Sequence, residues 1–183
     1  MEERLIRVGI THGDINGIGY EVILKTFSDI RIADLCTPII YGSSKIAAYH
    51  RKVLEMQPVN ISVINQAEDA GVNRINIINC ADEESKVELG KSTEIAGEAA
   101  FKALEAACND LKRGVIDVLV TAPINKHNIQ NDQFHFPGHT EYLEEVFGVS
   151  GKKALMILMS NNLRVALVTG HLPLSEVVQN ITK

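Results

Sequence analysis

A long amphipathic helix that leads directly into a buried strand constrains the fold of this chain most. Between Ser92 and about Arg113 the apolar residues recur at helical spacing and form one stripe: Ala96, Ala100, Leu104, Ala107 and Leu111. Gly114 follows and is typical of the position just beyond a helix end. The run Val115–Thr121 is mostly apolar and predicts a buried strand. A helix that turns back into such a strand is typical of an α/β protein.

The same alternation runs through most of the chain. Strands are predicted at 6–11, 37–42, 61–64, 75–78 and 115–121, and helices at 20–27, 44–56 and 92–113. Between the fourth strand and the long helix, residues 82–84 indicate an exposed acidic loop. This order predicts a sandwich of helices around a largely parallel sheet.

The last third of the sequence is expected to differ. Helices are predicted at 126–131 and 140–147, and two strands at 154–160 and 163–169 are joined by Asn161 and Asn162 as in a hairpin. A final helix begins at Leu174 and reaches Lys183 without a glycine or proline stop. We therefore expect the chain to be the front part of a longer protein.

The composition excludes several classes of protein. The chain is 45% hydrophobic and 22% charged, as in an ordinary globular protein. Its 18 Lys and Arg are outnumbered by 23 Asp and Glu, which argues against a nucleic-acid partner. No apolar run approaches the roughly 20 residues of a membrane span, and no signal peptide is evident. We expect a cytoplasmic protein in which Cys36, Cys80 and Cys108 are reduced packing thiols.

A glycine-rich turn, with glycines at 13, 17 and 19, lies between the first strand and the first helix. Its amides could hold an anion at the helix start, or it could be a tight turn that needs a positive φ angle. The spacing matches neither the dinucleotide fingerprint nor the P-loop. Asp14 is either a site residue or a cap for the next turn.

Two histidines lie in loops marked by proline and glycine. His139 lies in Pro-Gly-His-Thr-Glu, and His171 lies in Thr-Gly-His-Leu-Pro. Histidine is the commonest protein ligand of transition metals, so the residues alone suggest that these two share a metal. The alternative is that both bond only to loop backbone. Two ligands do not complete a catalytic zinc site, which normally takes three from the protein.

The loop after the 115–121 strand is a further candidate, because ligands in open α/β sheets bind at the carboxyl ends of strands. Lys126 could bind a phosphate or carboxylate there. His127 lies in a polar stretch and is expected to be solvated. His12, His50 and His135 show no clearer sign of a role, although His12 borders the glycine-rich turn.

Four segments together resemble the PdxA family of 4-hydroxythreonine-4-phosphate dehydrogenases. They are the glycine-rich opening at 10–19, Thr-Ala-Pro-Ile-Asn-Lys at 121–126, Pro-Gly-His-Thr-Glu at 137–141 and Arg-Val-Ala-Leu through His-Leu-Pro-Leu at 164–174. Their order and approximate spacing match from end to end. The opening departs from the family pattern at Ile15 and Tyr20, where prolines are common.

The resemblance replaces the pairing of the two histidines with separate roles. It implies that His139 and Thr140 contact the phosphorylated substrate and that His171 is a ligand of a divalent metal (zinc, magnesium or cobalt). The family's other metal ligands lie in a C-terminal part that this sequence lacks. No catalytic residue and no residue that binds the cofactor is assigned.

The resemblance also implies a fold and an assembly. The family's fold is similar to that of isocitrate and isopropylmalate dehydrogenases, with three-layer α/β/α domains and an active site in a cleft at a homodimer interface. Here that fold would be incomplete. Residues 1–120 would form the N-terminal part of the first domain, and residues 121–183 would form the truncated start of the second.

The reaction implied is the NAD- or NADP-dependent oxidation of 4-phosphooxy-L-threonine in pyridoxal phosphate (vitamin B6) biosynthesis. The product, 2-amino-3-oxo-4-phosphooxybutanoate, would then lose carbon dioxide to give 3-amino-2-oxopropyl phosphate. One alternative is a paralogous dehydrogenase of erythronate or threonate 4-phosphate. The other is a truncated domain that does no chemistry.

Overall fold

The computed structural model describes residues 5–80, 85–149 and 152–181. The chain divides into two compact units, residues 1–139 and 140–183, and each is described here by itself. The acidic loop predicted at 82–84 lies outside the described residues. The predicted domain boundary at 120/121 differs from this division and stays a prediction.

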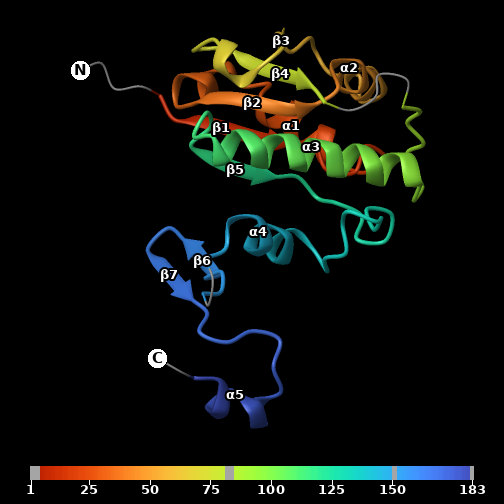
Figure 1. Cartoon of the computed structure of the whole chain (residues 1–183). Coiled ribbons are helices and arrows are strands. Elements are labelled where there is room, and N and C mark those ends of the chain that lie inside the picture. The colour runs from red at the N-terminus through yellow and green to blue at the C-terminus, as the bar shows by residue number, and fades with distance from the viewer. Residues whose placement is uncertain (1–4, 81–84, 150–151, 182–183) are drawn as a thin grey trace. The chain divides into compact units, whose positions relative to one another are not determined.

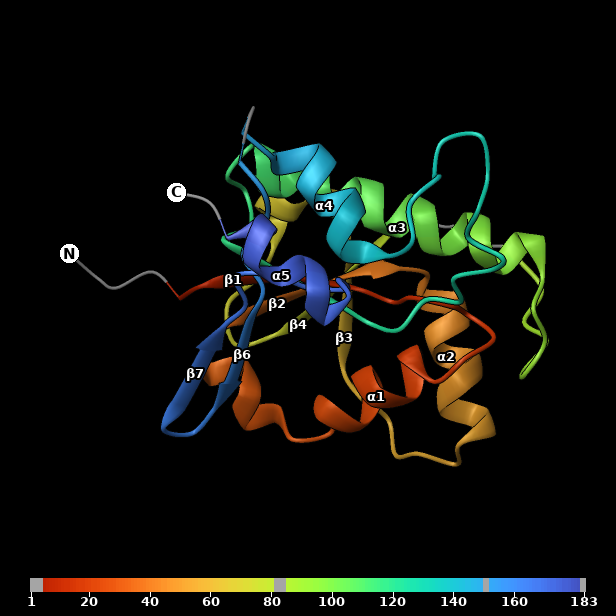
Figure 2. The ribbon, with the colours of Figure 1, turned by 90° about the horizontal axis from the view of Figure 1, so that it is seen from below.

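A five-stranded parallel sheet forms the centre of the first unit (Figure 1). Its strands are β1 (Arg7–Thr11), β2 (Thr37–Gly42), β3 (Ile61–Ile64), β4 (Ile75–Asn79) and β5 (Val118–Thr121), in the order β3-β4-β2-β1-β5. Helices α1 (Gly19–Thr26) and α2 (Ser44–Val53) cover one face, and α3 (Glu94–Lys112) covers the other (Figure 2). Two short 3-10 helices, η1 (Ile30–Asp34) and η2 (Ala67–Asp69), complete the unit. The predicted three-layer arrangement with a parallel sheet is therefore confirmed.

Strand β2 shows why the sheet is covered on both faces, because all six of its residues are buried. Ile40 belongs to the core cluster that includes Ile23 of α1 and Ile46 of α2. Its neighbours Ile39 and Tyr41 belong instead to the cluster that includes Ala103 and Ala107 of α3. Successive side chains of a strand point to opposite faces, so β2 supplies both cores.

Side chains cap the starts of α2 and α3, although α2 ends at Val53, before the predicted end at residue 56. The Ser43 hydroxyl accepts a hydrogen bond from the Ile46 amide (3.3 Å) at the start of α2. The Thr93 hydroxyl does the same for Ala96 (3.3 Å) at the start of α3. Gly114 follows α3 with φ +69°. Side-chain oxygens at these positions replace the hydrogen-bond partners that the first helical amides lack.

The helix predicted at 126–131 is wrong, because asparagine side chains hold this segment in turns. The Asn125 carboxamide accepts from the His127 amide (2.9 Å), and that of Asn131 accepts from the Gln133 amide (2.7 Å). Such local bonds offer the backbone amides partners that compete with helical carbonyls.

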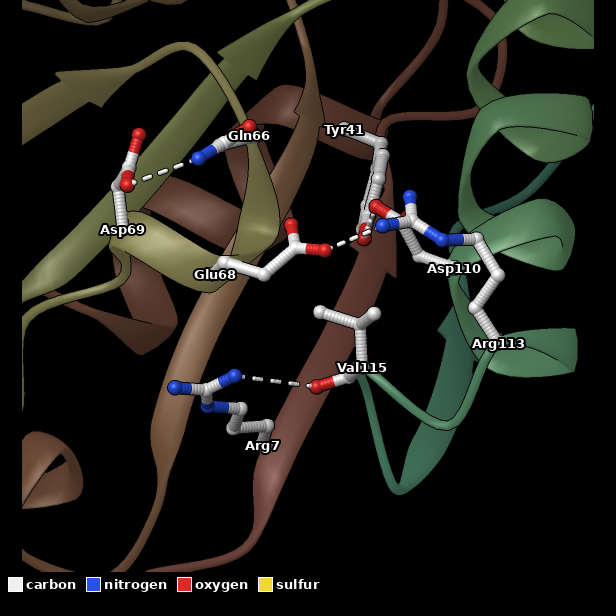
Figure 3. A network of polar contacts seen from close by, with 8 residues as sticks. All are labelled: Arg7, Tyr41, Gln66, Glu68, Asp69, Asp110, Arg113 and Val115. Carbon is white, nitrogen blue, oxygen red and sulfur yellow. Dashed lines mark hydrogen bonds and ion pairs between the residues drawn. The ribbon is translucent and has the colours of Figure 1, made fainter.

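A polar network fixes the end of α3 to the sheet and to η2 (Figure 3). The Tyr41 hydroxyl donates to the Asp110 carboxylate (2.7 Å), and the Arg113 guanidinium donates to the same carboxylate (3.0 Å). Arg113 also forms an ion pair with Glu68. The network therefore joins β2, α3 and η2 through side chains far apart in the sequence.

We expect Tyr41→Phe to lower the free energy of unfolding by about 1 kcal/mol, the typical net contribution of one hydrogen bond. Asp110 keeps its bond to Arg113, so no buried charge is left without a partner. The measurement is urea unfolding followed by circular dichroism. Tyr49→Phe is the matched control, because Tyr49 is 42% exposed. Equal effects of the two variants would contradict a role for the Tyr41 hydroxyl.

The second unit contains a hairpin of β6 (Ile157–Ser160) and β7 (Leu163–Ala166), and then α5 (Leu174–Asn180). Helix α4 (His139–Phe147) begins at the last residue of the first unit and continues into the second. The hairpin predicted around Asn161 is confirmed, with strands shorter than expected. In the part of the chain that the structure describes, no helix has the length and apolar character needed to cross a membrane.

Candidate functional site

The carboxyl ends of β1, β2 and β5 lie side by side at one edge of the sheet. Thr11 pairs with Tyr41 on one side and with Thr121 on the other. The glycine-rich turn and the loop after β5 therefore start next to each other. The Asp14 amide donates to the Pro123 carbonyl (2.9 Å) and joins the two loops. This edge is where ligands bind in open α/β sheets.

Gly13 makes this close approach possible. Its φ is +69°, and a Cβ there would lie 2.2 Å from the Pro123 carbonyl oxygen. The amides of Asp14, Asn16 and Gly17 already donate to protein oxygens. Of the two interpretations of the turn, the tight turn with a positive φ is the one that the structure favours.

Asn16 holds the turn to the segment that precedes α3, a contact that no feature of the sequence indicates. Its side-chain amide nitrogen, Nδ2, donates to the Lys91 carbonyl (3.0 Å) and to the Thr93 hydroxyl (2.9 Å). Its side-chain oxygen, Oδ1, accepts from the Glu88 amide (2.7 Å). An asparagine in a glycine-rich turn has the pattern of an ordinary turn residue, so only the fold shows these contacts. Asp14 caps this turn through the Asn16 amide, and burial raises the pKa of its carboxyl group.

His12 and His50 are buried rather than solvated and flank Tyr20. The rings of His12 and Tyr20 stack at 5.2 Å between centroids, and those of Tyr20 and His50 also stack at 5.2 Å. The Tyr20 hydroxyl accepts from the Ser43 amide (2.8 Å), and His50 Nε2 lies 2.8 Å from the Ile15 carbonyl. We call these three rings the histidine–tyrosine stack. Both positions that depart from the family's prolines, Ile15 and Tyr20, are therefore packed in the core.

Burial is the main influence on the pKa values of the two histidines in the stack. His12 is completely buried, and neither of its ring nitrogens has a partner among the described residues. Desolvation lowers the pKa of His12 to about 4 and also lowers that of His50. Both imidazoles are thus neutral at pH 7.

His139 lies close enough to Lys126 for the charges of the two side chains to interact. Burial and the nearby ammonium of Lys126 lower the pKa of His139, which keeps its imidazole neutral. Its Nε2 is buried and has no hydrogen-bond partner among the described residues. Thr140 follows on α4 and is exposed. A free imidazole nitrogen beside an ammonium group can bind a ligand that carries a phosphate. His127 is exposed, as expected, and His135 is exposed as well.

His171 lies on the connection between β7 and α5, is exposed and has φ +55°. The described residues contain no group of three His, Cys, Asp or Glu side chains able to hold a metal ion. The donor set within this part of the chain is therefore incomplete for the metal that the resemblance implies. The role of His171 as a metal ligand stays a prediction.

A family model described as pyridoxal phosphate biosynthetic protein PdxA matches residues 34–183. The chain belongs to the PdxA family. It is 61% identical over 183 residues to a 4-hydroxythreonine-4-phosphate dehydrogenase of Bacteroides thetaiotaomicron, covering all of this chain and 50% of that one. It is 32% identical to a D-threonate 4-phosphate dehydrogenase of Cupriavidus necator, covering 99% of this chain and 54% of the relative.

Solved structures agree with this assignment. The crystal structure of a 4-hydroxythreonine-4-phosphate dehydrogenase from Burkholderia phymatum matches with a TM-score of 0.84 and 29% identity. The match covers 97% of this chain and 53% of that one. This PdxA chain thus spans about half the length of the relatives it matches. The resemblance found in the sequence motifs and the fold class it implied are both confirmed.

Proposed function

We propose that this PdxA chain contributes to a dehydrogenase that oxidises 4-phosphooxy-L-threonine at its C3 hydroxyl, with NAD or NADP as the hydride acceptor. The observation that carries the proposal is the neutral His139 with an unpartnered Nε2 beside Lys126. The 61% identity to a 4-hydroxythreonine-4-phosphate dehydrogenase supports this choice of substrate. The 3-keto acid formed loses carbon dioxide readily, because the ketone accepts the electrons left behind.

Each proposed binding residue has a separate task. The Lys126 ammonium supplies a positive charge for the substrate's phosphate. The His139 imidazole is neutral, so Nε2 either donates a hydrogen bond to the substrate or accepts one, depending on the tautomer. The Thr140 hydroxyl, one residue later in the sequence, is the second polar group that we expect to contact the substrate. Fixed contacts of this kind orient the reacting carbon relative to the hydride acceptor.

The proposal extends to His171, as one ligand of a zinc, magnesium or cobalt ion whose other ligands lie outside the described residues. It also extends to a homodimer. Because the described donor set is incomplete, no chemical step is assigned to the metal.

A second candidate substrate is a phosphorylated four-carbon sugar acid, such as threonate 4-phosphate. The 32% identity to a D-threonate 4-phosphate dehydrogenase favours it. The two substrates differ at C2, where one carries an amino group and the other a hydroxyl. The much higher identity to the first class of enzyme leads us to prefer 4-phosphooxy-L-threonine.

We expect His139→Ala and Lys126→Met each to weaken binding of 4-phosphooxy-L-threonine about tenfold. A contact to a charged ligand group is typically worth about 1.5–3 kcal/mol, and about 1.4 kcal/mol corresponds to a factor of ten. The measurement is titration of the chain followed by ³¹P NMR. His127→Ala is the matched control, because His127 is exposed and lies next to Lys126.

Three results of this titration would contradict the proposal. Tighter binding of D-threonate 4-phosphate would favour the second substrate. Absence of binding of either ester would favour the non-catalytic alternative. Equal affinities of the His139→Ala and His127→Ala variants would remove His139 from the site.

A further inference from the structure

A crevice on the first unit lies apart from the residues assigned to the phosphorylated substrate. It has a volume of about 170 Å³ and is formed by α1, α2 and the start of β3. Its lining residues are Leu24, Ser44, Ala47, Ala48, Arg51, Val59 and Ile61. None of them belongs to the segment that carries Lys126 and His139. The crevice is therefore independent of the proposed function.

One face of α2 forms much of the lining. Ser44, Ala47, Ala48 and Arg51 follow the spacing of residues that share a helix face. The two alanines leave space beside the helix, whereas the polar side chains lie one at each end of this row. Opposite them, Leu24, Val59 and Ile61 supply aliphatic side chains. The crevice thus combines apolar walls with a single cationic group.

Arg51 has no ionic partner among the described residues, although it is half-buried. Two other arginines of the first unit do have one: Arg31 pairs with Asp29 (2.5 Å), and Arg113 pairs with Asp110 (3.0 Å). A guanidinium group is planar and presents several N–H donors that match the two oxygens of a carboxylate. The unpaired Arg51 thus fits an external carboxylate.

We propose that this crevice binds a small amphipathic monocarboxylate. The hydrocarbon part lies against Leu24, Val59 and Ile61, and the carboxylate pairs with Arg51. The volume suits a ligand of this size, because an engineered apolar cavity of about 150 Å³ holds benzene. The unpaired guanidinium excludes a cationic ligand, and the aliphatic walls disfavour one that is polar throughout.

The test is a titration of the chain with benzoate, followed by ¹H–¹⁵N NMR. We expect saturable shifts confined to the amides of α1, α2 and the start of β3. Benzyl alcohol and benzylamine have similar shapes without the negative charge and should bind at least tenfold more weakly. Arg51→Gln should weaken benzoate binding at least tenfold. Lys52→Gln is the matched control, because Lys52 is the exposed neighbour on the same helix.

A second variant separates loss of the site from loss of the fold. Ala48 is exposed, so Ala48→Leu can fill the crevice without disturbing the core, and leucine is a good helix former. It should abolish the shifts while the rest of the spectrum is unchanged. Benzoate binding unaffected by Arg51→Gln, equal binding of benzyl alcohol, or no saturable shift in the folded wild-type chain would overturn the proposal.

Discussion

Replacing Gly97 with alanine is expected to lower the free energy of unfolding by about 3 kcal/mol, a magnitude typical of a steric clash in a packed core. A Cβ at this position would lie 1.8 Å from the carbonyl oxygen of Asn128 and 2.3 Å from its carbonyl carbon. Both are backbone atoms of the loop after β5, so the clash is relieved only by moving that loop or α3. The measurement is urea unfolding of the chain followed by circular dichroism.

The sign of this change in stability distinguishes a steric clash from the effect of helix propensity. Within a helix, alanine is intrinsically favoured over glycine by about 1 kcal/mol, so propensity alone predicts stabilisation. Asn109→Ala is the matched control on α3, because Asn109 is exposed and the change should be neutral or slightly stabilising. If Gly97→Ala stabilised the chain as well, the close packing of α3 on the Asn128 loop would be refuted. The same loop carries Lys126, so weaker binding of phosphate esters should accompany the destabilisation.

Lowering the pH from 6.5 towards 4 is expected to cost about 3 kcal/mol of stability through His12 alone. Its pKa is about 4 in the folded chain and 6.5 in a free side chain. The unfolded chain therefore binds a proton in this range while the folded chain does not. The stabilisation is fully present above pH 6.5 and is lost as the pH falls towards 4. His50, whose pKa is also lowered, acts in the same direction.

Comparison of variants separates the contribution of His12 to the pH dependence from the contribution of the carboxyl groups. The raised pKa of Asp14 acts in the opposite sense, because the folded chain then takes up the proton first. We expect His12→Phe to keep an aromatic ring against Tyr20 and to make the unfolding free energy less dependent on pH between 6.5 and 4. His127→Phe, at an exposed position, should leave the dependence unchanged. If the unfolding free energy of the His12→Phe chain depended on pH as in the wild type, His12 would not be the source of the pH dependence.

The fold was predictable from the sequence because its signals are local. The bounds predicted for the strand at 37–42 are those of β2, since its apolar run ends at Gly42 and a capping serine. The long helix has both an alanine stripe and recognisable ends. The failure at 126–131 is also local, because Asn125 and Asn131 bond to the backbone in ways that residue spacing does not reveal.

The candidate site was predictable only in part, because it depends on contacts between distant residues. Lys126 and His139 were each identified, but the effect of Lys126 on the pKa of His139 arises only when the loop after β5 returns to the start of α4. The histidine–tyrosine stack was missed altogether. Sequence alone does not distinguish a buried neutral histidine from a solvated one, since the difference lies in the residues packed around it.

The pairing of β1 with β5 has a consequence for folding during synthesis. Val8 lies beside Val118 in the sheet, so one neighbour of β1 is translated about a hundred residues after it. At typical elongation rates this interval lasts roughly 5–20 s, during which the backbone groups on one side of β1 lack their final partner. The β6–β7 hairpin, whose strands are adjacent in sequence, can form within about 1–10 μs of leaving the ribosome. Delayed pairing leaves β1 open to strands of other nascent chains, so we expect conditions that slow translation to favour aggregation over assembly of this sheet.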